Sequence, residues 1–141
     1  MRPLKVLFIC VGNTCRSPMA EAMARTLGSG RLEAFSAGLS PTGRVAEESL
    51  AALRALGYRP DGLSSKSLDG VPVDHVDVAV SLIGPPGLRF LPHGFADRVE
   101  AWSIRDPYGD DDAVYLSVAR TIESRVRELV EDLLRSELTD L

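Results

Sequence analysis

Residues able to carry out chemistry gather in one short segment near the start of the chain. This segment reads Cys10-Val11-Gly12-Asn13-Thr14-Cys15-Arg16-Ser17 and places a thiol six residues before a guanidinium. The backbone N–H groups of such a loop, together with the start of a following helix, form a cradle for a tetrahedral oxyanion. The same positive field favours a nucleophilic thiolate, and an arginine grips two anion oxygens. The spacing therefore predicts an enzyme with Cys10 as nucleophile and Arg16 as anion-binding residue.

The whole loop is expected to surround the anion. Its oxyanion-binding residues are predicted to be Val11, Gly12, Asn13, Thr14, Cys15, Arg16 and Ser17. The hydroxyl of Ser17 is expected to hydrogen-bond the sulfur of Cys10. The glycine spacings of a dinucleotide-binding loop or a Walker loop do not occur here, so the sequence argues against those nucleotide sites.

A carboxylate farther along the chain is a second candidate. Asp106 lies in the sequence Asp106-Pro107-Tyr108, just after an expected strand. A carboxylic acid at this place can protonate a leaving group and then activate water. If the preceding strand neighbours the first one, its end opens onto the same cleft. We therefore predict Asp106 as the third catalytic residue.

Strand and helix patterns alternate along the chain and position these residues. Strands are expected at Leu4–Cys10, Arg31–Ala37, Val76–Leu82 and Arg98–Ile104, and helices at 17–27, Thr42–Leu56 and from Asp112 onward. Ser17 is expected to cap the first helix, with Pro18 in its first position. The alternation indicates an α/β fold, a parallel sheet with helices on both faces. In such sheets ligands bind beyond the carboxyl ends of the strands.

Composition limits the class of protein. The chain has 141 residues, of which 45% are hydrophobic and 26% charged, as expected for a single globular domain, here a catalytic one spanning 1–141. A net charge of −4 argues against a nucleic-acid partner, and no apolar run is long enough to span a membrane. Two cysteines and two distant histidines lack the spacing of a zinc site, so no metal or cofactor is predicted. Reduced thiols favour a cytoplasmic protein.

These motifs resemble the low-molecular-weight protein tyrosine phosphatase superfamily, which includes the thioredoxin-coupled arsenate reductases. The resemblance rests on the loop with Pro18-Met19-Ala20-Glu21-Ala22 behind it, on Ser36-Ala37-Gly38 and on Asp106-Pro107. It implies a phosphatase I-like fold with a four-stranded parallel sheet flanked by helices. It also implies that Cys10 is the nucleophile, Arg16 the oxyanion binder and Asp106 the general acid. Asn13, Ser17 and Ser36 match the network that supports the loop.

The arsenate reductase branch is the favoured one. The short segment from Ser81 to Pro107, with Trp102 before Asp106, resembles that branch in length. However, the two further cysteines of thioredoxin-coupled reductases align with Ile83 and Phe90. An internal relay of three cysteines is therefore impossible, and an external thiol must resolve the arsenic adduct. Thioredoxin, glutaredoxin or a small thiol are the expected donors, and Cys15 is a candidate short-range resolver.

Some of these reductases hold a potassium ion at positions that match Asn13, Glu21 and Ser36. The fourth position, usually acidic, aligns with Ser65. Because the acidic residue is missing at this position, we predict no bound metal ion.

Two alternatives stay open at this point. One is a phosphatase that hydrolyses phosphotyrosine or phosphoarginine through a phosphocysteine intermediate. Tyr108 resembles the aromatic wall of a phosphotyrosine cleft, and Thr14 is the residue type of protein arginine phosphatases. The other is a non-enzymatic oxyanion or redox sensor, against which the intact Cys10, Arg16 and Asp106 argue.

Overall fold

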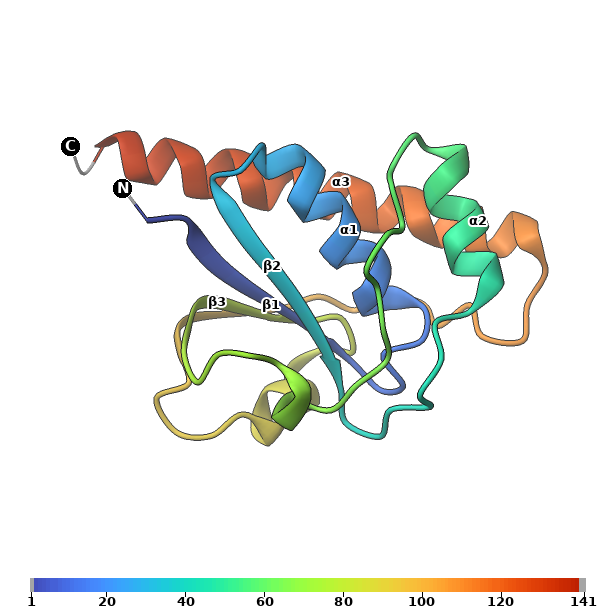
Figure 1. Cartoon of the computed structure of the whole chain (residues 1–141), viewed down its shortest axis with the longest axis horizontal. Coiled ribbons are helices and arrows are strands. Elements are labelled where there is room, and N and C mark those ends of the chain that lie inside the picture. Colours follow the sequence, from blue (N-terminus) through green and yellow to red (C-terminus); the bar gives the residue numbers. More distant parts are fainter. Residues whose placement is uncertain (1, 140–141) are drawn as a thin grey trace.

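The computed structural model describes residues 2–139, with side chains described as far as residue 136. Four strands form one parallel sheet: β1 (Leu4–Cys10), β2 (Leu32–Gly38), β3 (Val76–Ser81) and β4 (Ala96–Ala101) (Figure 1). Their order across the sheet is β2-β1-β3-β4. The predicted α/β domain with a four-stranded parallel sheet is therefore confirmed. Among the described residues, no helix is long and apolar enough to cross a membrane.

Three α-helices cover one face of this sheet. They are α1 (Arg16–Gly28), α2 (Glu47–Ala55) and α3 (Asp112–Thr139), which run together above the strands in Figure 1. Phe8 of β1 and Met23 of α1 are fully buried between these layers, as are Ile122 and Val126 of α3. The expected apolar stripe of the terminal helix therefore faces the core.

The opposite face of the sheet is covered by shorter structure. Leu7 and Ile9 of β1 pack there against Val71 and Phe95. The helices on this side are the 3₁₀ turns η1 (Leu68–Gly70) and η2 (Pro85–Phe90), joined by loops. Helices therefore flank both faces, with every described α-helix on one of them.

The first helix begins earlier than expected. Cys15 takes the N-cap position of α1, and no side chain caps the helix. The prediction that Ser17 is the cap was wrong, because its hydroxyl is turned toward the sulfur of Cys10 instead. At the other end, Ser29 adopts the left-handed conformation with φ of 48°, one residue beyond Gly28.

The second helix is shorter than the predicted Thr42–Leu56. Residues 42–46 do not coil, because the backbone N–H groups at the two ends of this segment bond to the loop. The N–H of Thr42 donates to the carbonyl of Gly12 at 3.1 Å, and that of Ala46 to the carbonyl of Thr14 at 3.0 Å. This segment therefore fastens the loop to the start of α2.

The order of the strands bears on how Asp106 reaches the first strand. The fourth strand does not neighbour the first, since β3 lies between them. The strand itself ends at Ala101 instead of Ile104, while β2 and β3 shift by a single residue at their ends. Beyond β4, the N–H of Ile104 bonds to the carbonyl of Leu82 at 3.2 Å. The chain thus crosses the end of β3 on its way back to the first strand.

Candidate active site

Cys10 is the last residue of β1, at the carboxyl edge of the sheet. Its side chain is 2% exposed, and its Sγ lies 2.8 Å from the Oγ of Ser17 in the first turn of α1. The chain leaves a central strand, turns within five residues and enters a helix, so the loop wraps around the sulfur. This is the predicted arrangement of strand, loop and helix.

A cavity of about 250 Å³ opens above this loop. Cys10, Arg16, Asp106 and Tyr108 all line it, although the chain separates the first from the last by nearly a hundred positions. Its other lining residues are Val11, Gly12, Thr14, Cys15, Ser40 and Thr42. The structure therefore brings the predicted catalytic residues together at one small, partly enclosed site.

Arg16 is held from the segment that follows β4. Its Nη1 donates to the carbonyl of Ile104 at 3.0 Å, and its Nη2 lies 3.6 Å from Oδ2 of Asp106. The guanidinium is buried, whereas 53% of the Asp106 side chain is exposed. The backbone N–H of Tyr108 bonds to Oδ1 of the same carboxylate at 3.1 Å. The crossing segment thus carries Asp106 to the cavity without β4 lying beside β1.

Asn13 organises the loop from below. Its φ of 49° is left-handed, a conformation that asparagine tolerates better than most residues. Its Nδ2 donates to Ser17 Oγ at 2.8 Å and to Ser36 Oγ at 2.9 Å, while its Oδ1 accepts the N–H of Lys66 at 2.9 Å. The three residues predicted to support the loop, Asn13, Ser17 and Ser36, therefore share one buried network.

Several residues around the loop were missed by sequence reasoning. Ser40 and Thr42 line the cavity, and the hydroxyls of Thr14 and Thr42 are hydrogen-bonded to each other. The Oγ of Ser65 donates to the carbonyl of Gly12 at 2.9 Å. These contacts join segments far apart along the chain, and no local motif signals them.

Gly38 allows a close approach between β2 and the loop. A Cβ at this position would lie 2.7 Å from the carbonyl oxygen of Val11 and 2.8 Å from the N of Asn13. Both atoms belong to the backbone and cannot move aside without moving the loop. A glycine is therefore required at the end of this strand.

The second cysteine lies in different surroundings. Cys15 is 3% exposed, and its Sγ lies 3.5 Å from the hydroxyl of Tyr115 on α3. Burial raises the pKa of the Cys15 thiol, an effect that hydrogen bonding from Tyr115 only partly offsets. Burial likewise raises the pKa of Tyr115. Cys15 is thus a buried thiol packed against the helical layer.

The residues at the matching potassium positions do not fit a bound ion. Glu21 is 2% exposed, and its carboxylate is bound by the hydroxyl of Ser36 and by the guanidinium of Arg25. The hydroxyl of Ser65 donates to the carbonyl of Gly12 and accepts a hydrogen bond from the N–H of Gly43 at 3.0 Å. The guanidinium of Arg25 already pairs with the Glu21 carboxylate, and the described residues contain no group of three or more His, Cys, Asp or Glu able to hold a metal.

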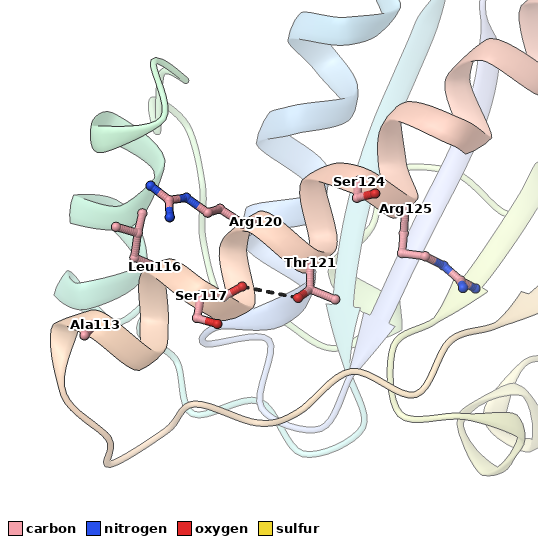
Figure 2. Close-up of a pocket in the computed structure, with 7 residues that line it drawn as sticks. All are labelled: Ala113, Leu116, Ser117, Arg120, Thr121, Ser124 and Arg125. Carbon is pink, nitrogen blue, oxygen red and sulfur yellow. Dashed lines mark hydrogen bonds between the residues drawn. The ribbon is translucent and has the colours of Figure 1, made fainter.

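A larger hollow of about 660 Å³ lies along α3 (Figure 2). Its lining residues are Ala113, Leu116, Ser117, Arg120, Thr121, Ser124 and Arg125. Thr121 donates its hydroxyl to the carbonyl of Ser117 at 3.3 Å, which satisfies it within the helix. This hollow has no thiol, carboxylate or imidazole in its lining, so the cavity above Cys10 is the candidate active site.

The sequence profile described as "Low molecular weight phosphotyrosine protein phosphatase" matches residues 5–86. The chain belongs to the low molecular weight phosphotyrosine protein phosphatase family. One relative in this family is the glutaredoxin arsenate reductase of Synechocystis sp., which is 36% identical over 131 residues. That alignment covers 92% of this chain and 95% of the relative.

Solved structures of similar proteins have the same fold as this chain. A structure described as "An arsenate reductase in the phosphate binding state" superposes with a TM-score of 0.80 and 32% identity, covering 94% of this chain and 98% of the other. The low molecular weight protein tyrosine phosphatase from T. tengcongensis superposes with a TM-score of 0.78 and 26% identity, covering 92% and 99%. The predicted resemblance is confirmed, and both branches occur among these similar proteins.

Proposed function

We propose that this protein is an arsenate reductase that acts through a covalent adduct on Cys10 and takes its electrons from an external thiol. The observation that carries the proposal is the convergence of Cys10, Arg16 and Asp106 on one cavity of about 250 Å³. The similarity to the glutaredoxin arsenate reductase extends over nearly the whole chain and supports the choice of substrate.

The first step forms a sulfur–arsenic bond. Arsenate lies in the loop, where the backbone N–H groups of residues 11–17 and the guanidinium of Arg16 bind its oxygens. The Cys10 thiolate attacks arsenic, and one oxygen leaves as water after Asp106 donates a proton. Preorganised donors that match the charge of the transition state lower the barrier to this step.

The second step reduces arsenic. A thiol RSH attacks the sulfur of Cys10, and the sulfur–arsenic bond breaks with its electron pair staying on arsenic. Arsenite departs and leaves a Cys10–S–S–R mixed disulfide. A second thiol then attacks that disulfide and restores Cys10. The balance is arsenate plus two thiols to arsenite, one disulfide and water.

The donor in this scheme comes from outside the chain. The sequence has two cysteines, and the second is buried against Tyr115. A glutaredoxin, a thioredoxin or a small thiol is therefore the proposed partner, and the need for a reduced thiol supports a cytoplasmic location. Nucleic acid and membrane partners have no role in this reaction.

A protein phosphatase is the second candidate, and Tyr108 is the observation that favours it. This ring is 67% exposed at the rim of the cavity, where an aromatic or guanidinium leaving group would stack. Asp106 would protonate the leaving oxygen or nitrogen of a phosphorylated side chain, and water would then hydrolyse the phosphocysteine.

Arsenite formation from arsenate separates these functions. The reaction is run with the thioredoxin system, with glutathione or mycothiol plus a glutaredoxin, and with bacillithiol, using Cys10→Ser as the blank. We expect turnover with at least one donor and none with the blank. Turnover with no donor would reject the reductase, and hydrolysis of phosphotyrosine and phosphoarginine peptides would then be compared. A protein inactive in every assay would be the oxyanion or redox sensor.

Tyr108→Ala supplies a further distinction between the two enzymes. Arsenate has no side chain to stack on the ring, so arsenite formation should stay within about twofold of wild type. Phosphopeptide hydrolysis should fall about tenfold, the value of one aromatic contact. Phe90→Ala is the matched control, because Phe90 is 63% exposed and does not line this cavity.

A further inference from the structure

A continuous line of hydrogen bonds leads from the sulfur of Cys10 to an arginine on the outer part of α1. It runs through Ser17, Asn13 and Ser36 to Glu21, with successive distances of 2.8, 2.8, 2.9 and 2.5 Å. These four intermediate side chains are at most 2% exposed. At its far end the Glu21 carboxylate pairs with Arg25, whose side chain is 43% exposed.

Two groups set the directions of these bonds: the Glu21 carboxylate at Ser36, and the backbone N–H of Lys66 at Asn13. An ionised carboxylate only accepts, so Ser36 must donate its single proton to Glu21. Ser36 can then only accept from Asn13. The amide of Asn13 is oriented by the N–H of Lys66, which bonds to its Oδ1 and leaves Nδ2 facing both serines.

The same logic fixes the bond at the sulfur. Ser17 accepts one proton of the Asn13 amide and therefore has its own proton free to donate. Its remaining neighbour is Cys10, at 2.8 Å. A donated hydrogen bond stabilises a thiolate, so the orientation of the Asn13 amide favours the charged form of the nucleophile.

The carboxylate of Glu21 is buried, and its ion pair is with Arg25. A buried carboxylate without a partner carries a large desolvation cost and takes up a proton instead. Arg25 provides the compensating charge. The other nearby cation, Lys66, directs its Nζ to the carbonyl of Ser64 at 2.9 Å and does not contact the carboxylate.

We propose that Arg25 and Glu21 form a positioning pair that anchors Ser36, and through it Asn13, in the place from which Ser17 is held to donate to the Cys10 thiolate. The guanidinium takes the place that a potassium ion would hold at Glu21, which makes the loop independent of added cations. This inference rests on the proposed role of Cys10. Neither residue of the pair touches the substrate cavity.

The test measures how fast iodoacetamide alkylates Cys10 at neutral pH, with the modified residue identified by fragment mass spectra. Alkylation needs no oxyanion and no thiol donor, so its outcome is read separately from that of arsenate reduction. Arg25→Gln should slow alkylation about tenfold, the effect of losing one hydrogen bond to a charged group. Arg25→Lys should restore most of the rate, because it keeps the charge.

Arg127→Gln is the matched control. Arg127 pairs with Glu123 four residues earlier on α3, as Arg25 does with Glu21 on α1, but away from the loop. Glu21→Gln is a second variant of nearly unchanged volume and should also slow alkylation. An alkylation rate of Arg25→Gln or Glu21→Gln equal to that of Arg127→Gln would overturn the proposal, as would an Arg25→Lys variant as slow as Arg25→Gln. So would faster alkylation of the wild type in KCl than in choline chloride of equal ionic strength.

Discussion

The sulfur of Cys10 lies 2.8 Å from the hydroxyl of Ser17, and both groups are buried beneath the cavity. This contact joins the last residue of a strand to the first turn of the next helix. Because Ser17 also accepts a proton from Asn13, its own proton is directed at the sulfur.

Ser17→Ala should therefore lower the rate of arsenite formation more than it changes the KM for arsenate. We expect kcat to fall about tenfold to a hundredfold, as charge-assisted hydrogen bonds are worth about twice neutral ones. Ser117→Ala, an exposed serine of α3, is the control for the loss of a hydroxyl. Equal kcat values for the two variants would show that the hydroxyl does not act on the thiolate.

Gly38→Ala should damage the loop from the neighbouring strand. The added Cβ would meet two backbone atoms within 3 Å, so the loop has to shift. We expect turnover to be lost and the free energy of unfolding to fall by about 1–3 kcal/mol, as in other overpacked sites. Chemical denaturation and arsenite formation measure the two effects.

Gly70→Ala is the comparison for this change, because there the nearest atom is the Cβ of Lys66 at 3.1 Å and no backbone atom is among the three nearest. An active Gly38→Ala protein of wild-type stability would contradict this prediction. It would mean that the end of β2 and the loop after β1 can move apart without loss of function.

Cys15→Ser should retain arsenite formation with an external donor. Burial raises the pKa of the Cys15 thiol, so it stays protonated and unreactive at neutral pH. We expect kcat within about threefold of wild type, measured with the donor that supports turnover. A folded Cys15→Ser protein without turnover would instead make Cys15 the thiol that resolves the adduct.

Tyr58 makes the free energy of unfolding depend on pH in the alkaline range. Its hydroxyl donates to Oε2 of Glu123 at 2.5 Å, and burial raises its pKa from 10.0 to about 12. The unfolded chain therefore loses this proton before the folded protein does. The contribution of Tyr58 is fully present below pH 10 and is lost as pH rises through about 12.

Tyr58→Phe should show a shallower loss of stability across this interval than the wild type. Unfolding free energies from urea titrations at several pH values measure the difference. Parallel curves for the two proteins would mean that the hydroxyl contributes nothing to the pH dependence.

Local sequence was sufficient for the elements whose signals lie within a few residues. The apolar run of β1 is buried on both faces of the sheet and the apolar stripe of α3 on one side of the helix, and their residue patterns predict this directly. The thiol and guanidinium also met as predicted, since one turn between strand and helix limits how far apart they can be.

Contacts between residues far apart in the sequence determined where α2 begins and how Asp106 reaches the cavity. Residues 42–46 were predicted to be helical, yet the N–H groups of Thr42 and Ala46 bond to the loop, because β2 ends beside it. Asp106 reaches the cavity only because the chain crosses the end of β3, a consequence of the order in which strands pair.

Residue spacing and the family resemblance thus predicted Cys10, Arg16 and Asp106 at the site, but not Ser40 and Thr42, which also line the cavity. The hydrogen bond at Cys10 depends on the backbone N–H of Lys66, which orients Asn13 and which no motif contains. Because Glu21 is buried, its ion pair with Arg25 and its hydrogen bond from Ser36 are electrostatically stronger than they would be in water. Burial and partner choice arise when distant segments pack together, so no local pattern records them.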